Sequence, residues 1–167
     1  MLNTTTYFGT DGTLVLSDAR DFDADAFALL LPQDGQVARV TNVTLALRMD
    51  LRPFHEMGAR YPSELRAGNI AISGTVERAY INGALLRLMI GQYAIEPEAA
   101  GLPIPSFTMK LAVDNLAPAG EQGNSILTVY GVMFDSWQAN LPEDDFMLER
   151  LTFAARRIQV DDKEIEG

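Results

Sequence analysis

Alternation of apolar and polar residues predicts that most of this chain is β-strand. The second half of residues 37–51 has an apolar side chain at every odd position, and residues 68–80 and 107–113 repeat this alternation. A two-residue period is typical of a strand with one buried face. Residues 147–160 alternate in the same way, whereas residues 125–137 are apolar on both faces, as in a central strand. The pattern therefore predicts five or more strands.

A helical period occurs at residues 80–91. Its apolar residues recur on one helical face, and Gly91 suits the position that follows a helix end. These apolar residues are Ile81, Leu85, Leu88 and Met89. A second, short helix is predicted at residues 23–32, where Pro32 would end it.

Segments rich in proline and glycine separate these elements. Residues 96–106 contain three prolines and predict an irregular connection, and residues 117–125 predict a hairpin loop. Strands and helices do not alternate as they would in a fold built on a parallel sheet. The predicted fold is therefore mainly β: an antiparallel β-sandwich or partial barrel with one flanking α-helix.

Composition favours a single domain that spans residues 1–167. The length suffices for one hydrophobic core, and the hydrophobic (47%) and charged (22%) fractions are those of an ordinary globular protein. No apolar run is long enough to span a membrane, and the N-terminal residues do not resemble a secretory signal. The absence of cysteine excludes disulfides and thiolate metal sites. We therefore expect assembly in a reducing cytoplasm, and a short flexible tail at residues 161–167.

The net charge of −10 limits the kinds of partner. A protein that grips nucleic acid through its phosphates needs clustered Lys and Arg, and an acidic chain argues against that class. Net charge also keeps proteins soluble, so the acidity has an ordinary explanation. A surface that must lie near nucleic acid without binding it would equally benefit from carrying the same sign.

The strongest candidate for catalysis is the single histidine, His55, which is followed by Glu56. These two residues begin like the H-E-x-x-H zinc motif, but Ala59 occupies the position of the second histidine. Pro53 and Gly58 would also break the helix that this motif needs. A hydrolase using His55 would need a nucleophile and an orienting carboxylate from elsewhere, and no motif supplies them. A loop or interface histidine is the favoured interpretation.

Acidic clusters give no metal site either. Asp21, Asp23 and Asp25 have the spacing that begins a calcium loop, but Ala26 and Pro32 replace the glycine and glutamate that such a loop requires. Residues 141–146 hold three adjacent carboxylates after a proline and predict a solvated turn. No glycine-rich phosphate loop or nucleophile elbow occurs. We therefore predict no catalytic residue, no metal and no cofactor.

The order of features from residue 37 to residue 160 carries a resemblance. A long strand leads into R-P-x-x-E-x-G-x-x-x-P, followed by the strand "GNIAISGTVERAY", the helix "INGALLRLMIG" and the closing "GVMFDSWQANLPEDDFMLERLTFAARRI". The first pattern is formed by Arg52, Pro53, Glu56, Gly58 and Pro62. This order resembles the tail tube proteins of long-tailed bacteriophages, whose contractile-tail members have about this length.

The resemblance implies a structural virion protein without enzymatic activity. Hexameric rings would join their strands into one barrel around a lumen, and stacked rings would form a tube through which DNA passes without specific binding. The expected partners are further copies of the chain and the tail sheath, baseplate and tail terminator proteins, with no membrane. The expected location is the virion tail, assembled in the host cytoplasm.

In this family, the long loop after the first strand reaches the adjacent ring, which implies that residues 50–66 form an interface between rings here. Phe54, Met57 and Tyr61 are the expected apolar anchors, and Arg52, Arg60 and Arg66 the expected ion-pairing groups. Aromatic residues and arginine are enriched at interface hot spots. The same surface would include Pro53, His55 and Glu56.

The polar faces of two strands are the expected lumen lining. They carry Asn42, Thr44, Asn69, Ser73, Thr75 and Glu77, which are short or acidic and include no cation. Lys or Arg would hold phosphates, whereas an acidic lining repels them. An ordinary solvent-facing side of a sheet explains the same residues. Four arginines on predicted strands would weaken the repulsion if they faced the lumen: Arg48, Arg78, Arg156 and Arg157.

Three alternatives stay open. The inner tube of a type VI secretion or contractile injection apparatus would use the same rings without DNA. A monomeric β-sandwich binding module would instead need an exposed aromatic platform, for which Trp137, Tyr130 and Tyr93 are the candidates. The hydrolase using His55 is the third.

Overall fold

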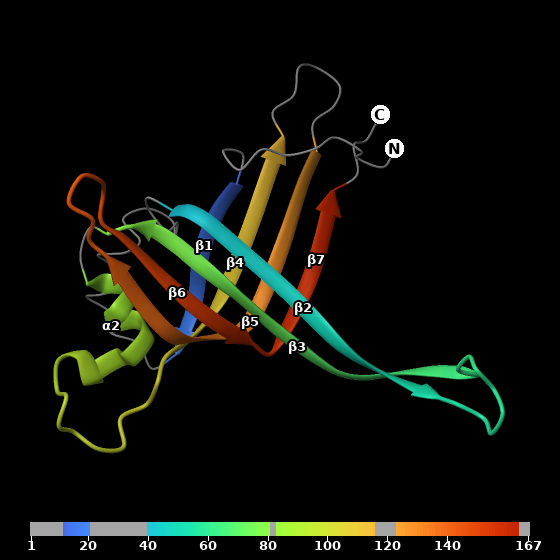
Figure 1. The fold of residues 1–167 in the computed structure, drawn as a ribbon. Coiled ribbons are helices and arrows are strands. Elements are labelled where there is room, and N and C mark those ends of the chain that lie inside the picture. The colour runs from blue at the N-terminus through green and yellow to red at the C-terminus, as the bar shows by residue number, and fades with distance from the viewer. Residues whose placement is uncertain (1–11, 21–39, 81–82, 116–122, 164–167) are drawn as a thin grey trace.

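The structure, a computed structural model, describes residues 12–20, 40–80, 83–115 and 123–163 (Figure 1). The described part contains seven strands, one α-helix and one 3-10 turn. The strands are β1 (Gly12–Arg20), β2 (Val40–Phe54), β3 (Glu64–Ala79), β4 (Ser106–Asn115), β5 (Gly123–Asn140), β6 (Leu148–Ala155) and β7 (Arg157–Lys163). The helix is α2 (Ala84–Ile90), and the 3-10 turn η2 (Gly91–Ala94) follows it directly.

All strand pairs are antiparallel, and β5 belongs to two half-sheets. Its N-terminal half pairs with β4 and β7, and β1 lies beyond β4; we call this group the first half-sheet. The C-terminal half of β5 pairs with β6, and β3 and β2 follow in that order; this group is the second half-sheet. Figure 1 shows that the strands of the two half-sheets cross. The predicted antiparallel, mainly β fold is confirmed.

β5 can pass from one half-sheet to the other because its core-facing side changes along the strand. Val129 is buried, and the buried positions then shift by one at Gly131, so that Val132 and Phe134 face the core. A pairing irregularity after Phe134 shifts them again, and Trp137 packs against the core. These two shifts explain why the sequence of β5 is apolar at both odd and even positions.

The first shift lies beside a sharp bend between β6 and β7. Gly131 has φ +65°, a conformation that favours glycine, and the side chain of Arg156 packs directly over it. The amide of Arg156 donates a hydrogen bond to the carbonyl of Tyr130 at 2.9 Å. The single strand predicted at residues 147–160 is therefore wrong in one respect: it breaks at Arg156 into two strands, one in each half-sheet.

The core lies between the two half-sheets and α2. It is formed by Leu14, Leu16, Ile72, Val76, Leu85, Leu88, Phe107, Met109, Val129, Val132, Phe134, Leu151 and Phe153. The rings of Phe107, Phe134 and Phe153 contact one another in sequence, with centroids 5.9 Å and 6.3 Å apart. Both half-sheets and α2 contribute to this core, so they pack together as one body.

Helix α2 contributes Leu85 and Leu88 to the core, as its apolar pattern predicts. It is shorter than the predicted helix because β3 continues to Ala79 and the chain tightens into η2 after Gly91. Gly91 ends the helix with φ +61°. No helix in the described part of the chain is both long enough and apolar enough to cross a membrane.

Several other expectations can be compared with the structure. Residues 95–105 form turns and irregular chain, as the prolines predict. β1 was not predicted, although Leu14 and Leu16 alternate with less buried neighbours. The helix predicted at residues 23–32 lies outside the described residues, as do residues 116–122, which connect β4 to β5. The terminal tail predicted from residue 161 begins within β7, which continues to Lys163.

Candidate assembly surfaces

β2 and β3 continue past the body of the molecule as a long hairpin (Figure 1). Every residue from Ala46 to Ala71 is exposed. The segment predicted as a contact loop, residues 50–66, is the end of this hairpin rather than an irregular loop. Arg52 pairs with Arg66 and Phe54 with Glu64, so only residues 55–63 lie outside the strands.

A bulge in β3 keeps Leu65 and Ile70 on the apolar face of the hairpin, whereas Phe54, opposite Glu64, lies on the other face. Met49 pairs with Ile70 and Leu51 with Ala67, so that one residue of β2 opposes two of β3, Gly68 and Asn69. The extra residue shifts the alternation of β3 by one position. Leu65 therefore lies on the same face as Ile70, although one position is odd and the other even.

The hairpin carries most of the exposed large apolar side chains. The described part of the chain exposes fourteen of them, and eight lie on the hairpin. These eight are Leu47, Met49, Leu51, Phe54, Met57, Tyr61, Leu65 and Ile70. Met57, at the tip, is 105% exposed. Only the three nearest the tip were predicted from the sequence as apolar anchors, because a loop at residues 50–66 would have no regular face.

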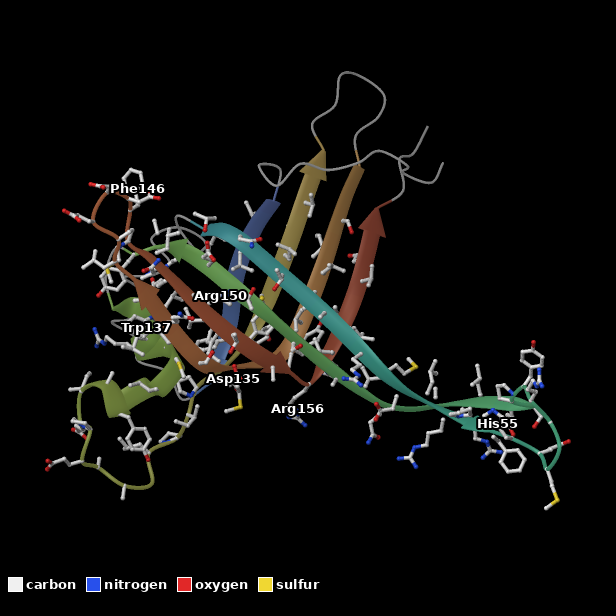
Figure 2. The ribbon with its side chains drawn as sticks, in the orientation of Figure 1. His55, Asp135, Trp137, Phe146, Arg150 and Arg156 are labelled. Carbon is white, nitrogen blue, oxygen red and sulfur yellow. The ribbon has the colours of Figure 1, made fainter. Side chains whose placement is uncertain are left out.

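The charged residues of the hairpin are also exposed. The guanidinium of Arg66 forms an ion pair with the carboxylate of Glu64 at 2.9 Å, and both side chains face solvent. Arg52 and Arg60 form no ion pair with another described residue. His55 lies at the tip of the hairpin, far from the body (Figure 2). This exposed position, remote from the core, gives the histidine no built pocket for catalysis.

The second half-sheet has a polar face opposite its core face. Its four strands are in register, so that residues on neighbouring strands form rows across the sheet. The residues of the following rows are called the polar face. One row runs Gln138, Arg150, Glu77 and Asn42; the next runs Ser136, Thr152, Thr75 and Thr44; the third runs Met133, Ala154, Ser73 and Ala46; and Ala71 with Arg48 follows. Five of the six residues predicted for a lumen lie in these rows, and the sixth, Asn69, lies in the bulge.

Hydroxyl groups in the second row hydrogen-bond to one another. The side-chain oxygens of Thr44 and Thr75 are 2.5 Å apart, and those of Ser136 and Thr152 are also 2.5 Å apart. Thr152 in addition donates a hydrogen bond to the carboxylate of Asp135. The second row therefore consists of short side chains whose hydroxyl groups hydrogen-bond in two pairs.

The polar face is not acidic, which differs from the expectation of an acidic lining. Its rows hold one carboxylate, that of Glu77, and two guanidinium groups, those of Arg48 and Arg150. Asp135, which accepts from Thr152 beside the rows, adds a second carboxylate, so the charges balance in number. Figure 2 shows Asp135 and Arg150 on this sheet. Alternation places Arg150 opposite the buried Leu151, yet only Arg48 of these two arginines was expected as a possible lumen cation.

The other three arginines that were considered lie elsewhere. Arg78 points into the core and is only 1% exposed, Arg156 occupies the bend after β6, and Arg157 lies over the ring of Tyr130 at 4.8 Å. The guanidinium of Arg78 donates to a carboxylate oxygen of Glu149 at 2.5 Å. The indole of Trp137 donates to the other oxygen of Glu149 at 2.9 Å. This buried network lies behind the polar face and fixes β3, β5 and β6 to one another.

Both edges of the second half-sheet are unpaired among the described residues. β2 pairs with β3 alone, and the segment from Met133 to Asn140 pairs with β6 alone. An unpaired edge presents backbone donors and acceptors to another strand. The two edges run in opposite directions, so β2 of one copy could pair antiparallel with β5 of another.

The three candidates for an aromatic binding platform all make contacts within the chain. Trp137 is partly buried and donates to Glu149, and the ring of Tyr130 is covered by Arg157. The hydroxyl of Tyr93 accepts a hydrogen bond from the amide of Leu102 at 3.0 Å. Each aromatic side chain is therefore engaged within the chain, which gives little support to a carbohydrate-type platform.

Solved structures with this arrangement come from tail tubes and contractile injection systems. A chain of the anti-feeding prophage cap, described as the AFP tube terminating cap, matches with a TM-score of 0.64 and 11% identity over 98% of this chain and 95% of that chain. A chain of the PVC sheath–tube complex, from an extracellular contractile injection system in the extended state, matches with a TM-score of 0.63 and 8% identity, over 96% and 94% of the two chains. The protein has the tail tube fold.

The SPP1 tail tube has this fold as well, with a TM-score of 0.55 and 11% identity over 95% of this chain and 80% of that chain. No protein-family model matches the sequence, and no curated protein matches it. The likeness is therefore one of three-dimensional structure at very low identity. It places the hairpin, the polar face and the open strand edges within a tail tube fold and does not assign a role to any single residue.

Proposed function

We propose that this chain is a structural, non-catalytic subunit that assembles into hexameric rings, which stack into a tube. The observation that carries the proposal is the hairpin, because a continuous run of exposed residues from Ala46 to Ala71 holds eight large apolar side chains. Soluble monomers rarely expose a contiguous apolar surface of this kind, and such a surface marks an interaction site. The tail tube fold supports the same conclusion.

Ring closure would occur through the two open edges of the second half-sheet. β2 of one subunit and the C-terminal half of β5 of its neighbour would pair as antiparallel strands, and repetition around the ring would leave no edge exposed. The four-stranded half-sheets would then join into one barrel. Closed cyclic symmetry is the usual outcome when such head-to-tail contacts complete a circle.

The polar face would line the lumen of this barrel. Its hydroxyl rows and balanced charges offer few strong attachment points, which suits a conduit through which DNA passes without specific binding. The expected acidic lining is replaced in this proposal by a nearly neutral one. Residues 50–66 would then contact the adjacent ring, with Phe54, Met57, Tyr61 and the three arginines as the principal contacts.

A virion tail, assembled in the host cytoplasm, is the proposed setting, with sheath, baseplate and tail terminator proteins as further partners. The inner tube of a contractile injection or type VI secretion apparatus is the second candidate. It is favoured by the likeness to the PVC sheath–tube complex and by the balanced charges of the polar face, which need not repel phosphate. Both candidates use the same rings and differ in what passes through them.

The test of assembly is electron microscopy of the purified chain, combined with size-exclusion chromatography. Rings and tubes are the expected products, with a lumen bounded by the polar face. A species that stays at the 18.3 kDa of a single chain at high concentration would overturn the proposal and would favour a monomeric binding module.

The hairpin is tested by Phe54→Ala and Arg60→Glu. We expect both variants to form rings that fail to stack, because each removes an exposed contact without disturbing the core. Lys110→Glu, a charge reversal at an exposed position of β4, is the matched control and should leave stacking unchanged. Tubes of normal length from both hairpin variants would show that the hairpin is not the contact.

A further inference from the structure

The ends of the second half-sheet identify a surface that could receive the hairpin. Strand register places Ala79 of β3 and Asn140 of β5 opposite Leu148 of β6, at the end of the half-sheet far from the hairpin. Residues 141–147 connect β5 to β6 at this end. Figure 2 shows Phe146, in this connection, and His55, at the tip of the hairpin, on opposite sides of the molecule.

We infer that residues 141–146, the β5–β6 loop, are the docking surface for the hairpin tip of a second copy of this chain in the next ring. The inference rests on the proposed function. If subunits of a ring pair through their strand edges, the strand ends must point to the two rims of that ring. One rim then carries the hairpins and the other carries the β5–β6 loops, so rings stacked in the same direction bring the two together.

Exposure supports this pairing at both ends. The β5–β6 loop contains two large apolar side chains, Leu141 and Phe146, which are 75% and 81% exposed in the isolated subunit. The hairpin tip holds Met57 and Tyr61 in the same state. Contact between the two ends would remove four such side chains from water in a single head-to-tail interface.

Charge supports it as well. Glu143, Asp144 and Asp145 follow one another in the loop, and residues 141–146 contain no cation. Residues 50–66 hold three arginines and three carboxylates, whereas the rest of the chain holds ten cations against twenty carboxylates. The hairpin is thus neutral in net charge and does not repel the acidic loop, and Arg60 lies in its turn without an ion pair among the described residues. A contact between Arg60 and the carboxylates of the loop would fix the register of the interface, because opposite charges suppress wrong pairings.

The first test reverses the loop charges with Asp144→Lys combined with Asp145→Lys. We expect rings that no longer stack, with tube length reduced at least tenfold in electron micrographs. Adding Arg60→Glu to the same chain should restore tubes, because the opposite charges then face each other again. Tubes of normal length from the loop variant would overturn the inference while leaving the proposed function intact. A wild-type chain that forms neither rings nor tubes would overturn both.

The second test is a cross-link, which the absence of native cysteine makes free of background. Tyr61→Cys with Phe146→Cys should give disulfide-linked chains after oxidation of assembled tubes and none in dilute, unstacked protein. Tyr61→Cys with Ile95→Cys is the matched control, because Ile95 is exposed but lies after η2, away from the β5–β6 loop. Tubes that cross-link only in the control pair, or in neither pair, would overturn the inference.

Discussion

The body of the molecule and the hairpin are built from the same two strands but reach opposite states. In the body, β3 directs Val76 and Ile72 into a core that the other half-sheet and α2 complete, and Val43 and Leu45 of β2 pack against it. In the hairpin, from Ala46 to Ala71, the same alternation continues, but no other element of the described chain packs against the apolar face, which is exposed to solvent. Period-2 alternation therefore predicts which residues share a face of a strand. It does not predict whether another element of the same chain buries that face.

Each region contains an ion pair among its described residues, and these two pairs differ in their exposure to solvent. Arg78 and Glu149 are buried and joined by Trp137, whereas Arg66 and Glu64 face solvent. A buried charge that loses its partner has no water to compensate it, while an exposed charge is hydrated again at once. The body should therefore be sensitive to changes that the hairpin tolerates.

The largest expected effect is that of Glu149→Gln. It removes the negative charge of Glu149 from the buried guanidinium of Arg78, and breaking a buried pair in this way costs about 3–5 kcal/mol. Urea unfolding of the variant, kept as unassembled subunits, measures this loss. Glu64→Gln is the matched control, since exposed pairs contribute at most about 1 kcal/mol.

Removal of both buried charges sharpens this comparison. Arg78→Met with Glu149→Leu should recover most of the lost stability, because an apolar pair can replace a buried ion pair of similar volume. Part of the loss should persist, since the indole of Trp137 then has no acceptor. A double variant as unstable as Glu149→Gln would show that the unmatched charge is not the cause.

Leucine truncations give the next largest effect. Leu88→Ala in α2 should lower the free energy of unfolding by about 2–5 kcal/mol, because the side chain is fully buried and leaves a cavity. Leu65→Ala on the hairpin should change it by less than about 0.5 kcal/mol, because that side chain is already in water. Thermal or urea unfolding of the two variants makes the comparison directly. Equal losses would mean that the hairpin packs on the body in the isolated subunit.

The sequence predicted the architecture well where burial and alternation coincide. β2, β3 and β4 were located from alternation, and Leu85 and Leu88 from the helical period, because each has one covered face. β5 was predicted as a strand, but its passage from one half-sheet to the other was not. The changes of its core-facing side at Gly131 and after Phe134 depend on Arg156 and on the strands that pair with each half of β5. The break between β6 and β7 depends on the same contact.

The candidate surfaces were predicted less completely, for a related reason. The bulge at Gly68 and Asn69 changes the alternation, so Leu65 and Ile70 could not be assigned to one face from their spacing. Pro53 suggested a loop, yet it pairs opposite Leu65 at the end of an isolated hairpin, where a missing backbone donor is tolerated. The cations of the polar face needed the register of four strands, because Arg150 and Glu77 are 73 residues apart in sequence and adjacent in the sheet.

Gly74→Ala should give the smallest of the expected losses of folding stability in the body. A Cβ on Gly74 would lie 2.2 Å from the carbonyl oxygen of Thr44 and 2.6 Å from the ring of Phe153, so Gly74→Ala must push β2 or the aromatic core aside. Overpacking of this kind costs about 1–3 kcal/mol, measured by urea unfolding of the subunit. Gly83→Ala is the control, because a Cβ there meets no atom within 4 Å and φ is −76°. Since Gly74 lies in β3, opposite Leu45 and close to the point where the hairpin leaves the core, the variant should also disturb tube assembly more than Gly83→Ala does. A variant that is destabilised yet assembles normally would show that the base of the hairpin can shift without moving its tip.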